Sequence, residues 1–348
     1  MASFGPSLRA LVLVRLREFF REPEAVFWTY VFPILLAGGL GIAFRSQPPD
    51  PVRVGWAEWT RGDRGLRAAL ATDSGLVLLP YPDSTAAAVA LRNGKIVLLV
   101  LIDGGQIRYR YDDTRTETAP ALLRVDDALQ RARGRQDPFK ARRDPVRERG
   151  SRYIDFLLPG LIALNLMGSG VWGTGFSIVD ARRKKLLKRL LATPMSKAEY
   201  LLSFPLAQLL LLIIEVGTIL LFGILVFGVP LRGSLVSLGL TCTLGSLTFG
   251  ALGLLAAARP TTIEGASGVM NLLLMPMWVL SGVFFSAARF PDVVQPVIRA
   301  LPLTALVDAL RVIMLEGGSL GAVWGQLAIL AAWLVLGFLI ALRIFRWQ

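Results

Sequence analysis

The chain has 348 residues, of which 54% are hydrophobic and 18% charged, and this is too apolar for an ordinary soluble protein of its length. A formal net charge of +13 would indicate nucleic-acid binding in a soluble chain, but here the cations lie beside apolar segments or in one polar insert. Cations beside apolar segments are typical of membrane proteins, in which they fix the orientation of the spans, so we expect no nucleic-acid partner. The single cysteine, Cys242, excludes an intrachain disulfide and a cysteine-based metal site.

Six apolar segments are near or above the ~20 residues that a helix needs to cross a bilayer. The first is expected to remain as an anchor, because three acids (Glu18, Glu22 and Glu24) precede it and no small-residue cleavage motif follows. The predicted transmembrane helices cover residues 25–44, 154–179, 206–229, 235–258, 266–286 and 323–342.

Residues 1–24 precede the first span and have an amphipathic pattern. Apolar residues repeat at helical spacing from Leu8 to Phe19, and most of the charged residues lie off that face. This favours a helix along the cytoplasmic interface over a plain start to the span. Arg15 falls on the apolar side and would have to reach out of it.

Residues 45–152 form the only sizeable polar block. Alternating or apolar runs such as "PVRVGWAEW", "GLVLLPY", "KIVLLVLI" and "QIRYRYDD" predict strands, and helical stretches lie between and after them. The predicted order β-α-β-α-β-β-α is that of a compact α/β domain. Its last part, "GRQDPFKARRDPVRERG", has the composition of a linker.

Orientation follows from the cations in the short flanks of the spans. In a six-span chain the basic flanks all fall on one side, which is therefore cytoplasmic together with both termini. This places the α/β insert outside the cytoplasm. The flanking cations are Arg9, Arg15, Arg17, Arg21, the cluster 182–197, Arg259, Arg343 and Arg346.

The connector after the second span, residues 180–200, has six Lys or Arg within residues 182–189. Leucines recur at helical spacing among these cations, and the run breaks at "ATP", residues 192–194. A basic amphipathic helix of this kind rests on anionic lipid or docks on another protein.

Several segments together make the sequence similar to the type-2 permeases of ABC transporters. They are "FLLPGLIALNLMGSGVWGTGFSIV", "LLKRLLATPMSKAEYLL", "MWVLSGVFFS" and "RALPLTALVDALR". The resemblance covers the whole chain. Leu187, Arg189, Leu190, Thr193 and Pro194 match the family pattern after the second span. At Arg183, Lys185 and Leu186 the sequence departs from that pattern.

The resemblance implies a permease subunit of an ABC exporter whose connector is a coupling helix on a separate ATPase subunit. It also implies that residues 287–316, broken by three prolines, form a re-entrant pair of short outer helices. We favour ATPase docking over a purely lipid-anchored role. The coupling residues would be Arg182, Arg183, Lys184, Lys185, Leu187, Lys188, Arg189, Leu190, Thr193 and Pro194.

The chain has no G-x-x-x-x-G-K-[ST] loop, so we expect it not to be an enzyme and to bind no cofactor. ATP and Mg would bind in the partner subunit. Histidine is absent, and neighbouring Asp112 and Asp113 on a strand would point to opposite faces, so no metal site is expected.

Three polar residues within the predicted spans, Asn165, Glu215 and Asn271, are candidates for a transport path or a dimer interface. An ionisable side chain costs ~2.5–3.5 kcal/mol at the centre of a bilayer, so Glu215 needs a partner or water. The alternative is that Glu215 is protonated or bonded to a neighbouring Thr or Asn. For the asparagines, interhelical hydrogen bonding is favoured.

The sequence thus predicts an α-helical, multi-pass protein of the bacterial inner membrane with an extracytoplasmic α/β insert. Its leading function is ATP-driven export of a drug, lipid or other small molecule, as a homodimer or heterodimer with ATPase subunits. Two alternatives remain: a mechanotransmission complex that acts on an extracytoplasmic partner, and a membrane-anchored receptor or scaffold without an ATPase.

Overall fold

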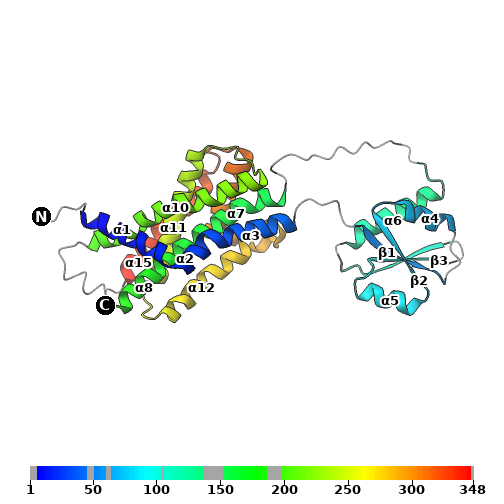
Figure 1. Ribbon diagram of the computed structural model, residues 1–348, viewed down its shortest axis with the longest axis horizontal. Helices are drawn as coiled ribbons and strands as arrows, with labels where there is room; N and C mark the ends of the chain where they lie inside the picture. The colour runs from blue at the N-terminus through cyan, green and yellow to red at the C-terminus, as the bar shows by residue number, and fades with distance from the viewer. Residues whose placement is uncertain are drawn as a thin grey trace. The chain divides into compact units, whose positions relative to one another are not determined.

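The computed structural model describes residues 6–44, 51–59, 64–103, 106–115, 117–136, 139, 150, 152–185 and 197–345. The chain divides into two compact units, a helical unit (Met1–Arg45 and Arg147–Gln348) and an insert (Ser46–Val146). Figure 1 shows each unit.

Six helices of the helical unit are long and apolar enough to cross a membrane, which confirms the prediction of six spans. The unit begins with α1 (Pro6–Arg21). The spans are α2–η1–α3 (Pro23–Val26, Phe27–Val31, Phe32–Ala43), α7–η2–α8 (Tyr153–Gly168, Ser169–Gly173, Thr174–Arg183), α10 (Lys197–Phe227), α11 (Leu235–Ala256), α12 (Ile263–Leu280) and α15 (Trp324–Ile344).

The second span lies at the centre of the bundle. Its most apolar stretch is 72% buried, and α7 contacts α3, α10, α11 and α14. Glycines allow η2 to approach α11 closely: a Cβ at Gly170 would lie 2.7 Å from Cβ of Phe249, and one at Gly253 would lie 2.7 Å from the carbonyl oxygen of Val171. Such contacts between small residues are a common way for membrane helices to pack.

The fifth span ends earlier than the sequence predicts, at Leu280 instead of residue 286. Gly282 follows with φ +73°, a left-handed conformation that glycine adopts easily and that ends helices. Arg311 donates a hydrogen bond of 2.7 Å to the carbonyl of Gly282 and stacks 3.5 Å over the Phe156 ring. These contacts fix the end of α12 against α7.

The segment between α12 and α15 contains short helices instead of a span. Pro296 and Pro302 lie in the first turns of α13 and α14, where a missing N–H costs nothing. Eight of the ten residues of α14 are buried, and this helix packs against α7 and α15. The elements are η3 (Ala287–Arg289), η4 (Asp292–Val294), α13 (Gln295–Ala300), α14 (Pro302–Arg311) and η5 (Val312–Glu316).

The insert is a four-stranded sheet in the order β2-β1-β3-β4, with β4 antiparallel to β3 and the other pairs parallel. Its element order along the chain is the predicted β-α-β-α-β-β-α. The elements are β1 (Val52–Ala57), α4 (Arg64–Thr72), β2 (Leu76–Tyr81), α5 (Ser84–Arg92), β3 (Leu98–Asp103), β4 (Gln106–Tyr111) and α6 (Thr118–Ala132).

Helices cover both faces of this sheet. Leu66 and Leu70 of α4 and Val125 and Leu129 of α6 form a core on one face, whereas α5 packs on the other. Two buried faces explain why the central strand β3 has the continuous apolar run "LLVLI" instead of an alternating pattern.

Candidate functional site

The described part of the predicted coupling region, residues 180–185, lies at one end of the helical unit, here called the basic end. It consists of α1, the end of α8, the turn between α11 and α12, and the end of α15. Figure 1 shows α1 and the ends of α8 and α15 together there. Arg182 lies within 5.2 Å of the Phe345 ring and contacts the α11–α12 turn, so these segments meet in space as well.

Arg182 is a buried cation in this region, with 7% of its surface exposed. Its guanidinium donates hydrogen bonds to the carbonyls of Ala257 (3.0 Å), Ala258 (3.3 Å) and Pro260 (2.6 Å). These acceptors follow the end of α11, where carbonyl groups lack helical partners and the helix dipole is negative. Arg182 therefore ties the end of the second span to the α11–α12 turn and is not displayed at the surface.

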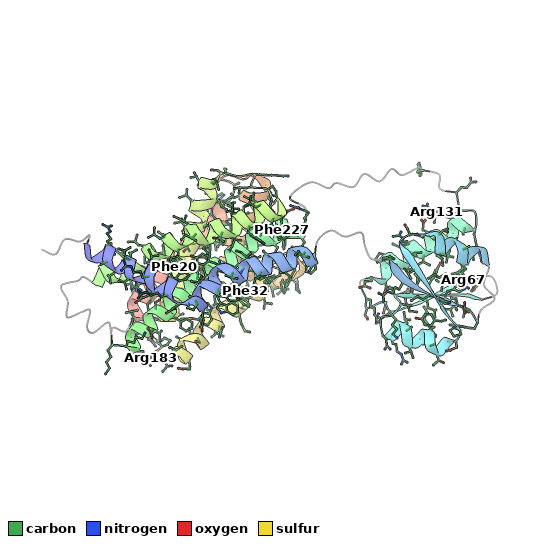
Figure 2. All side chains as sticks on the ribbon, viewed as in Figure 1. Phe20, Phe32, Arg67, Arg131, Arg183 and Phe227 are labelled. Atoms are coloured by element: carbon green, nitrogen blue, oxygen red, sulfur yellow. The ribbon has the colours of Figure 1, made fainter. Side chains whose placement is uncertain are left out.

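The next three cations have the opposite environment. Arg183, Lys184 and Lys185 are exposed, and Figure 2 shows Arg183 at the basic end. Lys184 lies 2.7 Å and Arg183 3.6 Å from the carboxylate of Asp180. Exposed ion pairs of this kind contribute little to stability, so these side chains remain available to a partner.

Residues 186–196 lie outside the described part of the chain. This range includes six of the predicted coupling residues, whose role stays a prediction: Leu187, Lys188, Arg189, Leu190, Thr193 and Pro194.

The N-terminal helix α1 packs against α10. Arg15, on the apolar side of α1, donates a hydrogen bond of 2.8 Å to Ser203 and stacks 3.3 Å from the centre of the Phe204 ring. The guanidinium of Arg15 is therefore stabilised by contacts with α10, and not by solvent alone. On the other side of α1, Leu13, Val14 and Phe20 are exposed, as expected of a helix that also meets lipid.

A second group of polar residues lies inside the bundle around Glu215 of α10. Glu215 is 1% exposed, and its Oε1 accepts a hydrogen bond of 3.0 Å from the hydroxyl of Ser169. The amide of Gln208 donates to the same hydroxyl at 3.1 Å. Glu215 therefore has a protein partner, as its position requires, and that partner is a serine in η2. A neighbouring Thr or Asn was only one of the alternatives that the sequence left open.

The two asparagines have different environments. Asn165 donates a hydrogen bond of 2.8 Å to the carbonyl of Thr29 in η1, the interhelical role favoured for it. Asn271 is exposed on α12, beside Leu272 (78% exposed) and Met275 (69%). Among the described residues nothing forms a hydrogen bond with its side chain, so the structure brings Glu215 and Asn165 into the bundle and leaves Asn271 outside.

In the insert, the acids interact with neighbouring side chains. Asp112 accepts hydrogen bonds from the backbone and hydroxyl of Thr114 and pairs with Arg115 at 3.3 Å, and these contacts hold the pKa of Asp112 below its usual value. Arg124 does the same for the pKa of Asp73 across 2.6 Å. Within the described residues, no group of three or more Cys, Asp or Glu is placed to hold a metal ion.

Sequence reasoning missed Ser169, Gln208 and Arg311. Serine and glutamine in an apolar span carry no signal by themselves. Only the fold shows that Ser169 bonds to Glu215 and that Gln208 bonds to Ser169. Arg311 lies in the proline-broken segment expected to form short outer helices, and nothing in that pattern shows that its side chain is largely enclosed by α7 and α12.

A bundle of six apolar helices with a folded polar insert after the first, and one basic end, is the architecture of a multi-pass membrane protein. The sequence matches the ABC-2 family transporter protein family over residues 24–343, and the chain belongs to this family.

Similar proteins include the probable multidrug ABC transporter permease YbhS of Escherichia coli, 24% identical over 89% of both chains. Nodulation protein J of Bradyrhizobium diazoefficiens is 27% identical over 58% of this chain and 76% of its own length. ABC transporter G family member 20 of Dictyostelium discoideum is 27% identical over 55% of this chain. The match spans only 26% of that longer protein.

Proposed function

We propose that this chain is the membrane subunit of an ATP-driven exporter, with a separate ATPase subunit docking at the basic end. The exported substrate is a drug, lipid or other small molecule, and the name of YbhS, a probable multidrug ABC transporter permease, supports the first of these. ATP and Mg bind in the partner subunit, the membrane is the bacterial inner membrane, and both termini are cytoplasmic.

The observation that carries this proposal is the contrast between Arg182 and the three residues after it. The exposed side chains of Arg183, Lys184 and Lys185 offer positive charge to a partner. Arg182, next to them, bonds three carbonyls of the α11–α12 turn. A force applied to the connector would therefore reach two spans besides its own, the behaviour that coupling to ATP hydrolysis requires.

The proposed exporter contains two copies of the permease. In the single chain, α12 exposes Asn271 among large apolar side chains. An amide facing lipid leaves its hydrogen bonds unmade, whereas an amide at an interface between membrane helices forms them. We therefore assign α12 to the contact with a second permease copy.

The test is whether an ABC-type ATPase subunit co-purifies with this chain. Charge pairs at an interface affect the encounter rate and the register of two proteins more than their affinity. Neutralising one cation of the connector should therefore have a mild effect on ATPase binding. Neutralising four together should clearly reduce ATPase binding and the stimulated ATPase turnover. The test variant replaces Lys184, Lys185, Lys188 and Arg189 by glutamine; the matched control replaces Arg67, Arg92, Arg108 and Arg131 of the insert, which are exposed.

The insertion of the test variant has to be checked, because the same cations help to keep the connector inside. If the correctly inserted variant binds the ATPase normally, the cations are only a topological signal. If the wild-type chain binds no ATPase, a receptor or scaffold is the better explanation.

A further inference from the structure

The carboxyl group of Glu215 is closed off within the bundle, and only one of its oxygens has a partner. Oε1 accepts the hydrogen bond from Ser169, whereas Oε2 is buried without a hydrogen-bond partner among the described residues. No water-sized space adjoins Oε2. The site as it stands therefore has room for a proton and for nothing larger.

Among the residues that the structure describes, no cation pairs with this carboxyl group. The titratable groups near enough to interact with it are Tyr30 of η1 and Cys242 of α11, and neither carries positive charge. From α7 and η2 it meets Ser169. On α1, Arg15 contacts Ser203, which lies twelve residues before Glu215 on α10, or about 18 Å of helix away.

A carboxylate in this environment would bear its full desolvation cost, which amounts to several kcal/mol for an unpaired ion. Binding a proton removes that cost. The same carboxyl group is flanked by two π-helical turns, η1 with Tyr30 and η2 with Ser169. Turns of this type disturb regular helix bonding and occur frequently at functional sites.

We propose that Glu215 is an intramembrane proton-binding site, protonated in the closed bundle and deprotonated when η1 and η2 part and admit water. In that step the O–H bond of the carboxylic acid breaks and the proton passes to water, leaving a hydrated carboxylate. Unmade hydrogen bonds of Oε2 and of the Tyr30 hydroxyl are then satisfied by water.

The direction in which pH shifts the equilibrium between the closed and the hydrated bundle follows from the number of protons that each binds. The closed bundle binds one more proton than the hydrated one, so lowering the pH favours the closed arrangement and raising it favours the hydrated one. This inference does not depend on an ATPase, and the permease alone suffices to test it.

The experiment is infrared spectroscopy of the permease in lipid nanodiscs. At neutral pH the wild type should show the C=O stretching band of a protonated carboxylic acid, and Glu215→Gln, which imitates the protonated form, should lack it. Ser169→Ala should move the band to higher frequency, because the hydrogen bond to Oε1 is lost. Glu264→Gln, at the exposed start of α12, is the matched control and should leave the band unchanged.

On alkaline titration the band should disappear while amide hydrogen exchange rises in residues 27–31 and 169–173, beyond the intrinsic effect of pH. Glu215→Gln should not show this additional exchange. A wild type without the acid band at neutral pH would overturn the proposal. So would a band that persists at alkaline pH with unchanged exchange, which would indicate a permanently protonated structural group.

Discussion

Arg182 and Arg183 are adjacent and chemically identical, yet they have opposite environments. In the sequence both are cations of one cluster, and nothing in their spacing separates them. In the fold, Arg182 points back to the end of α11, and Arg183 remains exposed. Which cation is structural depends on where α11 ends in space, and a local pattern does not contain that information.

Replacing these two arginines should therefore have different effects on stability. Arg182→Gln removes hydrogen bonds from a charged donor to three carbonyls and should lower the free energy of unfolding by about 2 kcal/mol. Arg183→Gln, the matched control, should change it by less than about 0.5 kcal/mol. Thermal unfolding in detergent measures both, and equal effects would show that the Arg182 contacts do not stabilise the bundle.

For Glu215 as well, the local sequence pattern does not identify the contacting residue. Its cost in a bilayer predicts that some partner exists. Which partner it is depends on the rotation of α7 and η2 relative to α10, and the sequence does not set that rotation. The chain from Gln208 through Ser169 to Glu215 thus became apparent only from the packed helices.

At the scale of elements, sequence patterns predicted much of the fold. The six spans and the order of strands and helices in the insert follow from apolar length and alternation, both local properties. Boundaries were less accurate. The fifth span ends at Leu280, just before Gly282, whose carbonyl binds Arg311, and the third span begins at Leu202 instead of residue 206. In α10, Pro205 did not stop the helix.

The α12 surface leads to a prediction about cross-linking. In a Cys242→Ala background, Asn271→Cys should form a disulfide between two permease copies in native membranes, because this position would face its counterpart. Leu225→Cys on α10, 73% exposed and expected to face lipid, is the control and should not cross-link. Cross-linking at residue 225 but not at 271 would assign the interface to another helix.

At the scale of the whole molecule, the structure gathers at one end the cations that the sequence places in separate flanks. Arg15 and Arg17 of α1, Arg182–Lys185, Arg259 and Arg343 all belong to the basic end. Cations in short flanks are retained in the cytoplasm, so this end should be cytoplasmic and the insert should lie outside.

Thiol labelling in intact cells tests this orientation directly. In the Cys242→Ala background, Ser84→Cys in the exposed first turn of α5 should react with an impermeant reagent, and Ser196→Cys in the basic connector should react only after the cells are permeabilised. One span separates the two positions, so they lie on opposite sides of the membrane. In either orientation, only one of them should be labelled in intact cells. Labelling of residue 196 with protection of residue 84 would invert the topology, and the ATPase could then not dock at the basic end.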